Sequence, residues 1–193
     1  MTDKIQTLSV ATVLSLFNPG GLYLVAYGFL FGMSVWISFF GGVIAYRTLA
    51  RPQFGALQHR TFPIYFVLSL GLASMLLGLW TVNHPDVQTH YGNPLVADVA
   101  QAYTLALVIL SQGSNYFIAC GSIDEQVSGL CKVTAMDKRT KVKVTTNPGV
   151  SDRMKALNGR FGMLHGISSL ANLGAVLALG FHGLWIGNFG LKA

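Results

Sequence analysis

The residues best suited to chemistry are polar side chains that interrupt otherwise apolar stretches of the sequence. One stretch carries four of them at i, i+3, i+4 and i+7, a spacing that puts all four on one face of an α-helix. They are His165, Ser168, Ser169 and Asn172. A second stretch carries three amides in a similar register: Gln101, Gln112 and Asn115. Because an amide or imidazole that faces hydrocarbon is costly, we predict that the two stretches meet in a polar seam.

Two roles are open for this polar seam. The side chains could simply hydrogen-bond to one another and fix the register of the helices, at about 0.6 kcal/mol for an average bond in a membrane bundle. They could instead line a small hydrated pocket or pathway, in which His165 would be the titratable member. The first role is structural, and the second is that of a transporter.

No familiar catalytic constellation is present. The sequence lacks a Cys-x-x-Cys pair, a His-Glu-x-x-His motif, a P-loop and a Gly-x-Ser-x-Gly elbow. His165 and His182 would lie about 25 Å apart along one helix, so they cannot share a haem or a metal ion. His84, His90 and His182 could meet on one side of the molecule, but no carboxylate pattern accompanies them, and we interpret them as surface histidines. We therefore expect no enzymatic activity, no metal site and no cofactor.

Four long apolar runs must position these residues. Of the 193 residues, 52% are hydrophobic and only 10% are charged, which is too apolar for a soluble domain of this size. Four runs contain no Asp, Glu, Lys or Arg and have the length of roughly 20 residues that a membrane-crossing helix needs. They are residues 22–46, 64–82, 99–119 and 163–184. The sequence therefore predicts an all-α integral membrane protein, a single domain over residues 1–193, with four transmembrane helices in a bundle.

Small residues one helical turn apart recur in these runs. Lipid tails are as apolar as Leu, so membrane helices associate through close packing at small side chains and through hydrogen bonds between helices. The pairs are Gly28 and Gly32, Ser38 and Gly42, Ser74 and Gly78, and Gly162 and Gly166. We expect such pairs to mark the contacts between helices.

Basic residues are shared unevenly among the connections, and this bias sets orientation during membrane insertion. The first connection carries Arg47, Arg51 and Arg60, and the third carries eight Lys or Arg residues. The second connection, residues 83–98, carries none. We therefore expect the first and third connections in the cytosol, and the second connection with both termini on the lumenal or exterior side.

The third connection, residues 121–160, is predicted to be a mobile basic loop. Its basic residues could act only as orientation signals, or the part from 132 to 160 could attract anionic lipid at about 1 kcal/mol per basic residue near the surface. No interleaving of aromatic and basic residues favours nucleic-acid binding. We expect the lipid bilayer, and possible protein partners, as the contacts of this protein.

The N-terminal segment is apolar but too short to span a membrane. Residues 5–17 carry polar side chains at a three-residue spacing, and the segment ends at the break Asn18-Pro19-Gly20-Gly21. This pattern predicts a short helix that lies in the membrane interface. A cleaved signal peptide is the alternative, although no small-x-small cleavage site follows.

A polar cluster is predicted where the second and fourth apolar runs begin. Both runs should enter the membrane from the same side, so Pro63 and Met163 should lie at similar depths, and Pro63 suits the first turn of a helix. The candidates for contact are Gln58, Arg60, Arg160 and His165, with Asn172 deeper along the same helix.

The same two regions carry a family resemblance. Residues 58–66 read Gln-His-Arg-Thr-Phe-Pro-Ile-Tyr-Phe, and residues 160–173 read Arg-Phe-Gly-Met-Leu-His-Gly-Ile-Ser-Ser-Leu-Ala-Asn-Leu. These stretches resemble the motifs of the transmembrane protein 205-like family of small eukaryotic four-span membrane proteins. The resemblance implies a four-span fold and makes His165, Ser168 and Asn172 motif positions. The chain departs from the family at residues 119–125, where a Pro followed by Arg, His and Glu would be expected.

The family has no settled biochemical activity, so the resemblance does not supply a function. We expect a non-enzymatic multi-pass protein of the endoplasmic reticulum or another endomembrane, with a role in trafficking or membrane organisation. The alternative is a small-molecule or ion transporter that uses the polar seam. The sequence has neither the internal repeat nor the Pro-broken span that many transporters use to build a binding site.

Overall fold

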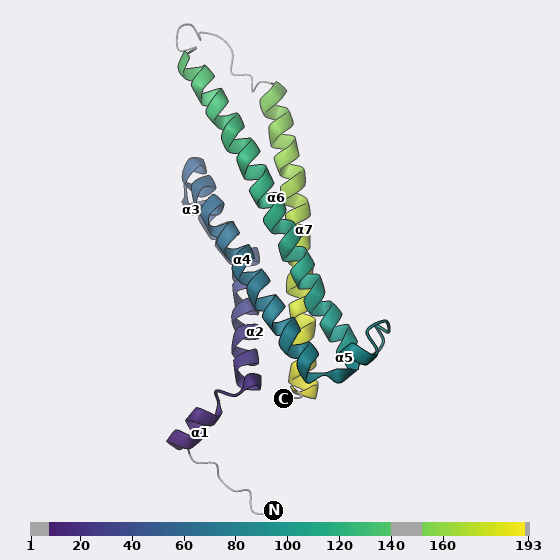
Figure 1. Ribbon diagram of the computed structural model, residues 1–193. Helices are drawn as coiled ribbons and strands as arrows, with labels where there is room; N and C mark the ends of the chain where they lie inside the picture. The colour runs from purple at the N-terminus through teal and green to yellow at the C-terminus, as the bar shows by residue number, and fades with distance from the viewer. Residues whose placement is uncertain (1–7, 140–151, 192–193) are drawn as a thin grey trace, which may run out of the picture.

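The computed structural model describes residues 8–139 and 152–191, and every regular element among them is a helix (Figure 1). The elements are α1 (Val10–Ser15), α2 (Pro19–Val35), the π-helix η1 (Trp36–Gly41), α3 (Gly42–Thr48), α4 (Arg51–Asn83), α5 (Pro85–Thr89), α6 (Ala97–Arg139) and α7 (Asp152–Phe189). The prediction of an all-α fold is confirmed for these residues.

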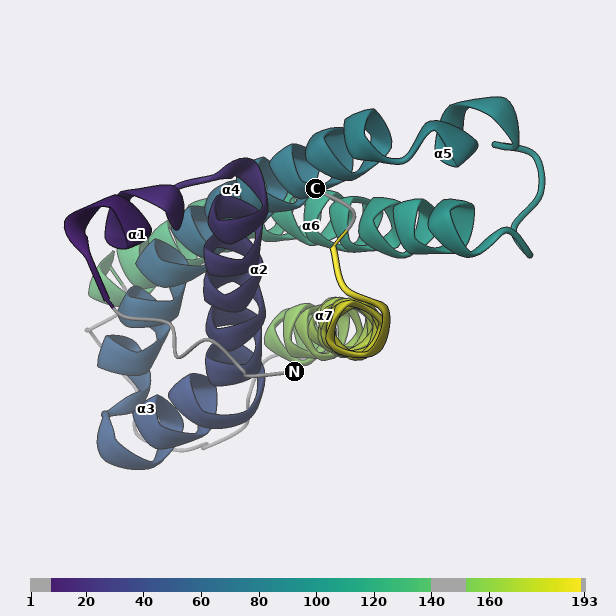
Figure 2. The same cartoon turned by 90° about the horizontal axis from the view of Figure 1, so that it is seen from below.

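Four helical rods form an elongated bundle (Figures 1 and 2). The first rod consists of α2, η1 and α3, which follow one another without a break, and the other rods are α4, α6 and α7. α6 packs against α4 and α7, and α2 packs against the same two helices. Among the described residues the backbones of α4 and α7 do not come close to each other, although side chains such as Tyr65 and Asn172 meet between them, so the two helices occupy one diagonal of the bundle. We name the two ends of the bundle the α5 end and the α3 end.

Local sequence signals explain where the rods begin. The Asn18 side-chain oxygen accepts a hydrogen bond from the Gly21 backbone N–H at 2.8 Å, and Pro19 occupies the first turn of α2, where its missing N–H costs nothing. Pro52 takes the equivalent place in α4. Pro63 lies inside α4 and not in its first turn, so the predicted helix start at this residue is wrong. The apolar run marks the part of α4 that can lie in the hydrocarbon of a membrane, and the helix itself begins earlier, at Arg51.

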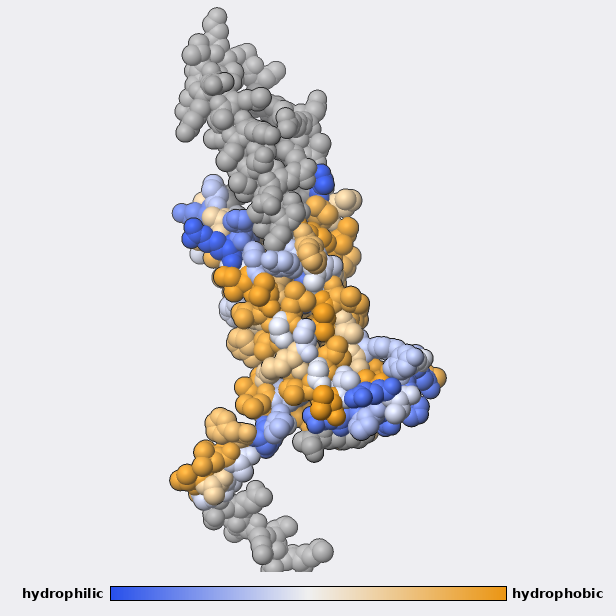
Figure 3. Space-filling model, in the orientation of Figure 1, coloured by the Kyte–Doolittle hydropathy of each residue, from blue (hydrophilic) through white to orange (hydrophobic). Residues whose placement is uncertain are grey.

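Three of the rods are long and apolar enough to cross a membrane: Pro19–Thr48, Pro52–Asn83 and Gly162–Phe189. They contain the predicted spans 22–46, 64–82 and 163–184. The predicted span 99–119 lies in α6, which is not among the three. On the face seen in Figure 3, orange apolar side chains cover the middle of the bundle, and blue polar side chains lie above and below them. The chain is therefore an integral membrane protein in contact with the bilayer.

A layer of leucines fills the centre of the bundle. Each rod contributes one Leu whose side chain is 0% exposed, and all four belong to one buried core. They are Leu30, Leu76, Leu105 and Leu179, which we call the leucine layer. This layer is the apolar middle of a bundle whose two ends are lined by polar groups.

The third connection differs from its prediction. α6 continues to Arg139 and α7 begins at Asp152, so helix covers both ends of the segment 121–160 that was predicted to be a loop. Residues 140–151 lie outside the described residues. The prediction ended the helix where apolar side chains end, but a helix satisfies its own backbone hydrogen bonds in water as well as in lipid.

The N-terminal helix is shorter than the one expected over residues 5–17. α1 spans Val10–Ser15, and residues 1–7 lie outside the described residues. Ser9 caps the helix by accepting a hydrogen bond from the Thr12 backbone N–H at 3.1 Å. Leu14 and Phe17 are exposed, and α1 lies apart from the four rods (Figure 1).

The predicted pairs of small residues do not make the close helix contacts. A Cβ added at most of these glycines would meet no described atom within 4 Å: Gly28, Gly32, Gly78, Gly162 and Gly166. The close approach occurs instead at Gly183 of α7, where a Cβ would lie 2.0 Å from the hydroxyl oxygen of Tyr27 on α2. Tyr27 donates a hydrogen bond to the Leu179 carbonyl at 2.8 Å, which holds the two helices together at this point.

Candidate functional site: two buried polar clusters

His182 joins three rods near the α5 end. Its Nε2 lies 2.6 Å from the Tyr23 hydroxyl, and its Nδ1 lies 2.8 Å from Gln101 Oε1. An amide oxygen can only accept, so Nδ1 carries a proton, and the Tyr23 hydroxyl donates to Nε2 of the neutral imidazole. We call Tyr23, Gln101 and His182, together with Trp80 and His84, the α5-end cluster.

Trp80 of α4 and His84, the residue that follows α4, complete this cluster. Their rings stack with centroids 3.8 Å apart, and Trp80 Nε1 donates to the Asp98 carbonyl at 2.9 Å. His84 Nδ1 donates to the Trp80 carbonyl at 2.8 Å. Since His84 is 2% exposed and His182 is 0% exposed, the interpretation of both as surface histidines is wrong. Both ring nitrogens of His182 and Nδ1 of His84 have hydrogen-bond partners inside the bundle, which makes burial possible.

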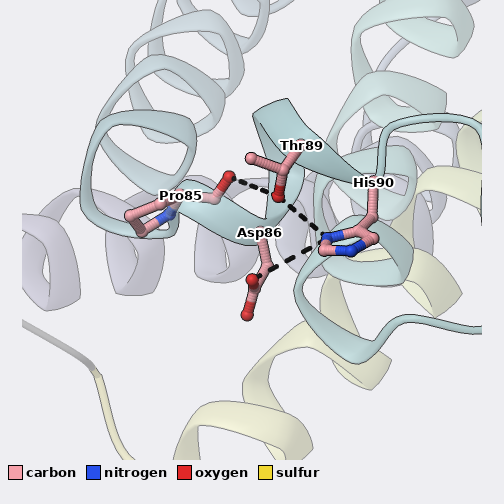
Figure 4. A network of polar contacts seen from close by, with 4 residues as sticks. All are labelled: Pro85, Asp86, Thr89 and His90. Carbon is pink, nitrogen blue, oxygen red and sulfur yellow. Dashed lines mark hydrogen bonds and ion pairs between the residues drawn. The ribbon is translucent and has the colours of Figure 1, made fainter.

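A separate, exposed network lies on α5 (Figure 4). His90 Nδ1 is 2.8 Å from the Thr89 hydroxyl and 3.8 Å from Asp86 Oδ1. Both members of the Asp86–His90 pair are more than half exposed, so the pair adds little stability. His90 is thus the one of the three histidines that lies on the surface, as predicted.

An open pocket of about 440 Å³ lies beside the α5-end cluster. Its walls come from α4, α5, the start of α6 and the end of α7, and they include Trp80, His84, Asp86, Asp98 and Trp185. Within residues 8–139 and 152–191, no group of three His, Cys, Asp or Glu side chains could hold a metal ion.

Asn172 joins all four rods near the α3 end. Its Oδ1 accepts hydrogen bonds from the Tyr65 hydroxyl at 2.9 Å and from Gln112 Nε2 at 3.1 Å. Its Nδ2 donates to the Ser38 hydroxyl, which in turn donates to the Ser34 carbonyl at 2.5 Å. We call Ser34, Ser38, Tyr65, Gln112 and Asn172 the α3-end cluster.

The π-helix η1 supplies Ser38 to this cluster. A π-helical turn contains more residues than an α-helical turn, so it rotates the side chains that follow it. Ser34 lies in the last turn of α2, and Ser38 lies within η1, so the two serines flank the change of helix type. Such π-helical insertions frequently occur at functional sites.

Five buried side-chain atoms have no hydrogen-bond partner among the described residues. They are Ser69 Oγ, Gln101 Nε2, Gln112 Oε1, and Asn115 Nδ2 and Oδ1. Asn115 is 0% exposed and follows Gln112 by one turn on the same face of α6. A buried polar atom without a partner costs about 1–3 kcal/mol, so this group is expensive unless something else satisfies it.

The leucine layer divides the predicted polar seam into these two clusters. Gln101 and Gln112 lie about 16 Å apart along α6, at 1.5 Å per residue. The face of α6 between them carries Leu105 and Val108, both 0% exposed. The interior is therefore polar at both ends and apolar in the middle.

The structure brings together only some of the residues predicted for the site. Gln112 and Asn172 share a hydrogen bond, and Asn115 is buried beside them. Ser168 is half-buried, whereas the remaining members on α7 are exposed: Arg160, His165 and Ser169. Of the polar stripe predicted on α7, Asn172 is therefore the member that bonds to other rods in the bundle interior.

At the starts of the second and fourth runs, the backbones of α4 and α7 do not come together among the described residues. Arg60 is exposed, and Gln58 lies against α3, with its Nε2 3.7 Å from a Cβ position on Gly42. The prediction placed the two helices at the same depth but also assumed that they are neighbours. They lie on a diagonal of the bundle, which keeps Gln58 away from His165.

Sequence reasoning missed the tyrosines and serines that complete both clusters. Tyr65 is 4% exposed, and its hydroxyl faces Asn172. Ser34 and Ser38 stand one helical turn apart, and small residues at this spacing predict helix packing without predicting hydrogen bonds to other rods. Tyr23 precedes Ser34 in an apolar helix, where a lone hydroxyl does not reveal which face is buried.

Comparisons with known proteins add a family relation. A family model described as a domain of unknown function (DUF4149) matches residues 25–120. Transmembrane protein 205 of Danio rerio is 36% identical over 64 residues, which cover 33% of this chain and 34% of that protein. The match thus spans about a third of the relative's length, and no solved structure matches the chain. Together with the motifs at residues 58–66 and 160–173, these matches show that the chain is similar to transmembrane protein 205 and support its assignment to a transmembrane protein 205-like family.

Proposed function

We propose that this chain is a non-enzymatic, four-crossing protein of the endoplasmic reticulum or another endomembrane, and that it acts in trafficking or membrane organisation. The observation that carries the proposal is the leucine layer, because one fully buried Leu from each rod closes the centre of the bundle. A packed centre suits a protein that works through its lipid-facing and partner-facing surfaces. The absence of a catalytic motif from the sequence supports the non-enzymatic part.

The fourth crossing in this proposal is α6. Its apolar part packs against both α4 and α7, which are themselves apolar enough to cross, so it must lie at the same depth in the membrane. Its three amides face the interior, where Gln101 and Gln112 bond to side chains of other rods. A helix that buries its polar groups against protein can cross even with a low mean hydropathy.

Three surface assignments belong to the same proposal. α1 would lie in the membrane interface, with its exposed Leu14 and Phe17 in lipid. The basic segment 132–160 would face the cytosol and would contact anionic lipid at its membrane-proximal end, near Arg160. Protein partners would bind at the cytosolic or lipid-facing surfaces.

Acceptor sites for N-linked glycosylation test the crossings and their direction. An acceptor inserted near Pro85 should be modified, and one inserted within residues 138–146 should remain unmodified, because the basic connections should stay in the cytosol. Modification of the second acceptor alone would invert the topology. Modification of both acceptors would place both ends of α6 on the same side of the membrane, and α6 would then not be a membrane-crossing helix.

A transporter is the second candidate, and the unpaired atoms near the α3 end favour it. Ser69, Gln112 and Asn115 offer unused hydrogen-bonding groups inside the bundle, as a solute site would. Transport would require the leucine layer to open. Purified protein in liposomes, screened for flux of ions and small polar solutes, separates the two functions. We expect no saturable flux, and reproducible saturable flux would replace the first proposal by the second.

A further inference from the structure

We propose that the α3 end of the bundle interior binds a small uncharged molecule that both donates and accepts hydrogen bonds, of which water is the smallest example. The site is formed by Gln112 and Asn115 on α6 and includes Ser69 on α4, which neighbours the Tyr65 hydroxyl that Gln112 Nε2 reaches at 3.2 Å. It holds its occupant whether or not the protein transports anything.

The proposal starts from burial. Gln112 and Asn115 are both 0% exposed, and the Asn115 amide has neither a donor nor an acceptor partner among the described residues. Ser69 is also 0% exposed, and its hydroxyl, which neighbours that of Tyr65, makes no well-formed hydrogen bond to a described residue. Left alone, each such atom would cost about 1–3 kcal/mol, and buried polar atoms in folded proteins are nearly always paired.

The positions of these groups suit one bridging molecule. Gln112 and Asn115 are three residues apart on one helix, so their Cβ atoms lie about 5–6 Å from each other. Two hydrogen bonds of about 2.8 Å in sequence span that distance. A buried water usually makes about three hydrogen bonds to polar groups that would otherwise be unsatisfied, and this site offers four atoms.

The chemistry of the site selects an uncharged occupant. Gln112 Oε1, Asn115 Oδ1 and Ser69 Oγ can accept, while Asn115 Nδ2 can only donate. A cation would be repelled by that N–H donor, and an anion would meet three oxygens. None of the three residues carries a charge that could offset the cost of a buried ion.

The sign of one stability change tests the occupancy. Asn115→Leu removes the amide with little change in volume. If the amide is bridged, the variant should melt at a lower temperature than the wild type in the same detergent, because Gln112 and Ser69 lose a shared partner. If no molecule is bound to the amide, removal of its two unpaired atoms should raise the melting temperature, and the proposal fails. Thr104→Val on the same helix is the matched control, because the Thr104 hydroxyl bonds only to the Ala100 carbonyl of its own helix, and its melting temperature should stay close to that of the wild type.

A measurement on the wild-type protein covers the case in which Asn115→Leu does not fold. In ¹⁵N-labelled protein in nanodiscs, the protons of the Asn115 side-chain amide should show a nuclear Overhauser contact to a bound molecule. A contact at the water frequency identifies water, and a contact at another frequency that disappears after exchange into solute-free buffer identifies a small neutral solute. Both results support the site. If neither contact is observed, the proposal is overturned.

Discussion

At the scale of single residues, the buried imidazole of His182 shows how the bundle accommodates a polar ring. Both ring nitrogens have partners, the Tyr23 hydroxyl on one side and the Gln101 amide oxygen on the other. Each partner comes from a different helix, so the ring fixes α7 relative to α2 and α6. The hydrogen bonds therefore specify register as well as satisfying the ring.

Tyr23→Phe should destabilise the protein by about 1–3 kcal/mol, because it leaves Nε2 of His182 buried without a donor. Thermal unfolding of the purified protein in detergent measures the effect. Tyr46→Phe is the matched control, since Tyr46 is 63% exposed and its ring contact with Phe54 is retained. Equal stability of Tyr23→Phe and wild type would mean that the hydroxyl does not donate to His182.

At the scale of helices, the close approach between α2 and α7 depends on a single glycine. Gly183 leaves room for Tyr27, whose hydroxyl oxygen and Cζ would lie 2.0 and 2.9 Å from an added Cβ. Gly180, one turn earlier on α7, would meet no described atom within 4 Å. The two glycines therefore have different roles, although both sit in the same apolar helix.

Gly183→Ala should lower the melting temperature strongly, because the new methyl group forces Tyr27 or the helix to move. Gly180→Ala should leave the protein unchanged or stabilise it by up to about 1 kcal/mol, through the higher helix propensity of Ala. The double variant Tyr27→Phe with Gly183→Ala should recover part of the loss, because the closest atom is gone. An equal effect of the two single Gly variants would contradict this packing.

Helix content and helix boundaries were not equally predictable from the sequence. The apolar runs located the rods, because charge-free stretches of this length are rare outside membranes. The rods extend well beyond the runs at Arg51, Arg139 and Asp152, because apolarity reports the membrane and not the hydrogen-bonding of the helix. The buried face of each helix was also hidden, since rods that are apolar all round give no amphipathic signal. An amide in an apolar run is a strong sign of burial, which is why Gln112 and Asn172 were found, whereas the buried Tyr65 and His182 were not.

At the scale of the whole molecule, the interior alternates between polar and apolar levels. The α5-end cluster, the leucine layer and the α3-end cluster follow one another along the bundle, and all four rods contribute to the leucine layer and to the α3-end cluster. The apolar middle provides packing, and the polar levels fix which helix faces which.

Leu105→Ala should therefore cost about 2–5 kcal/mol, since it opens a cavity in the leucine layer. Leu110→Ala on the same helix should change stability by less than about 1 kcal/mol, because Leu110 is 70% exposed and its side chain faces away from the core. Unfolding of both variants in the same detergent provides the comparison. Similar losses would mean that the two leucines share one environment.

The length of α6 limits which basic residues can sense the charge of a membrane. Its 43 residues make a rod of about 65 Å, whereas a bilayer with its headgroups is about 40–45 Å thick. If α6 crosses, its last turns, with Lys138 and Arg139, stand roughly 20 Å beyond the headgroups. The potential of an anionic leaflet decays over about 8 Å at physiological ionic strength, so these two positions are largely screened from it. The exposed Arg160, just before the apolar part of α7, stays within its range and is the better reporter of lipid charge.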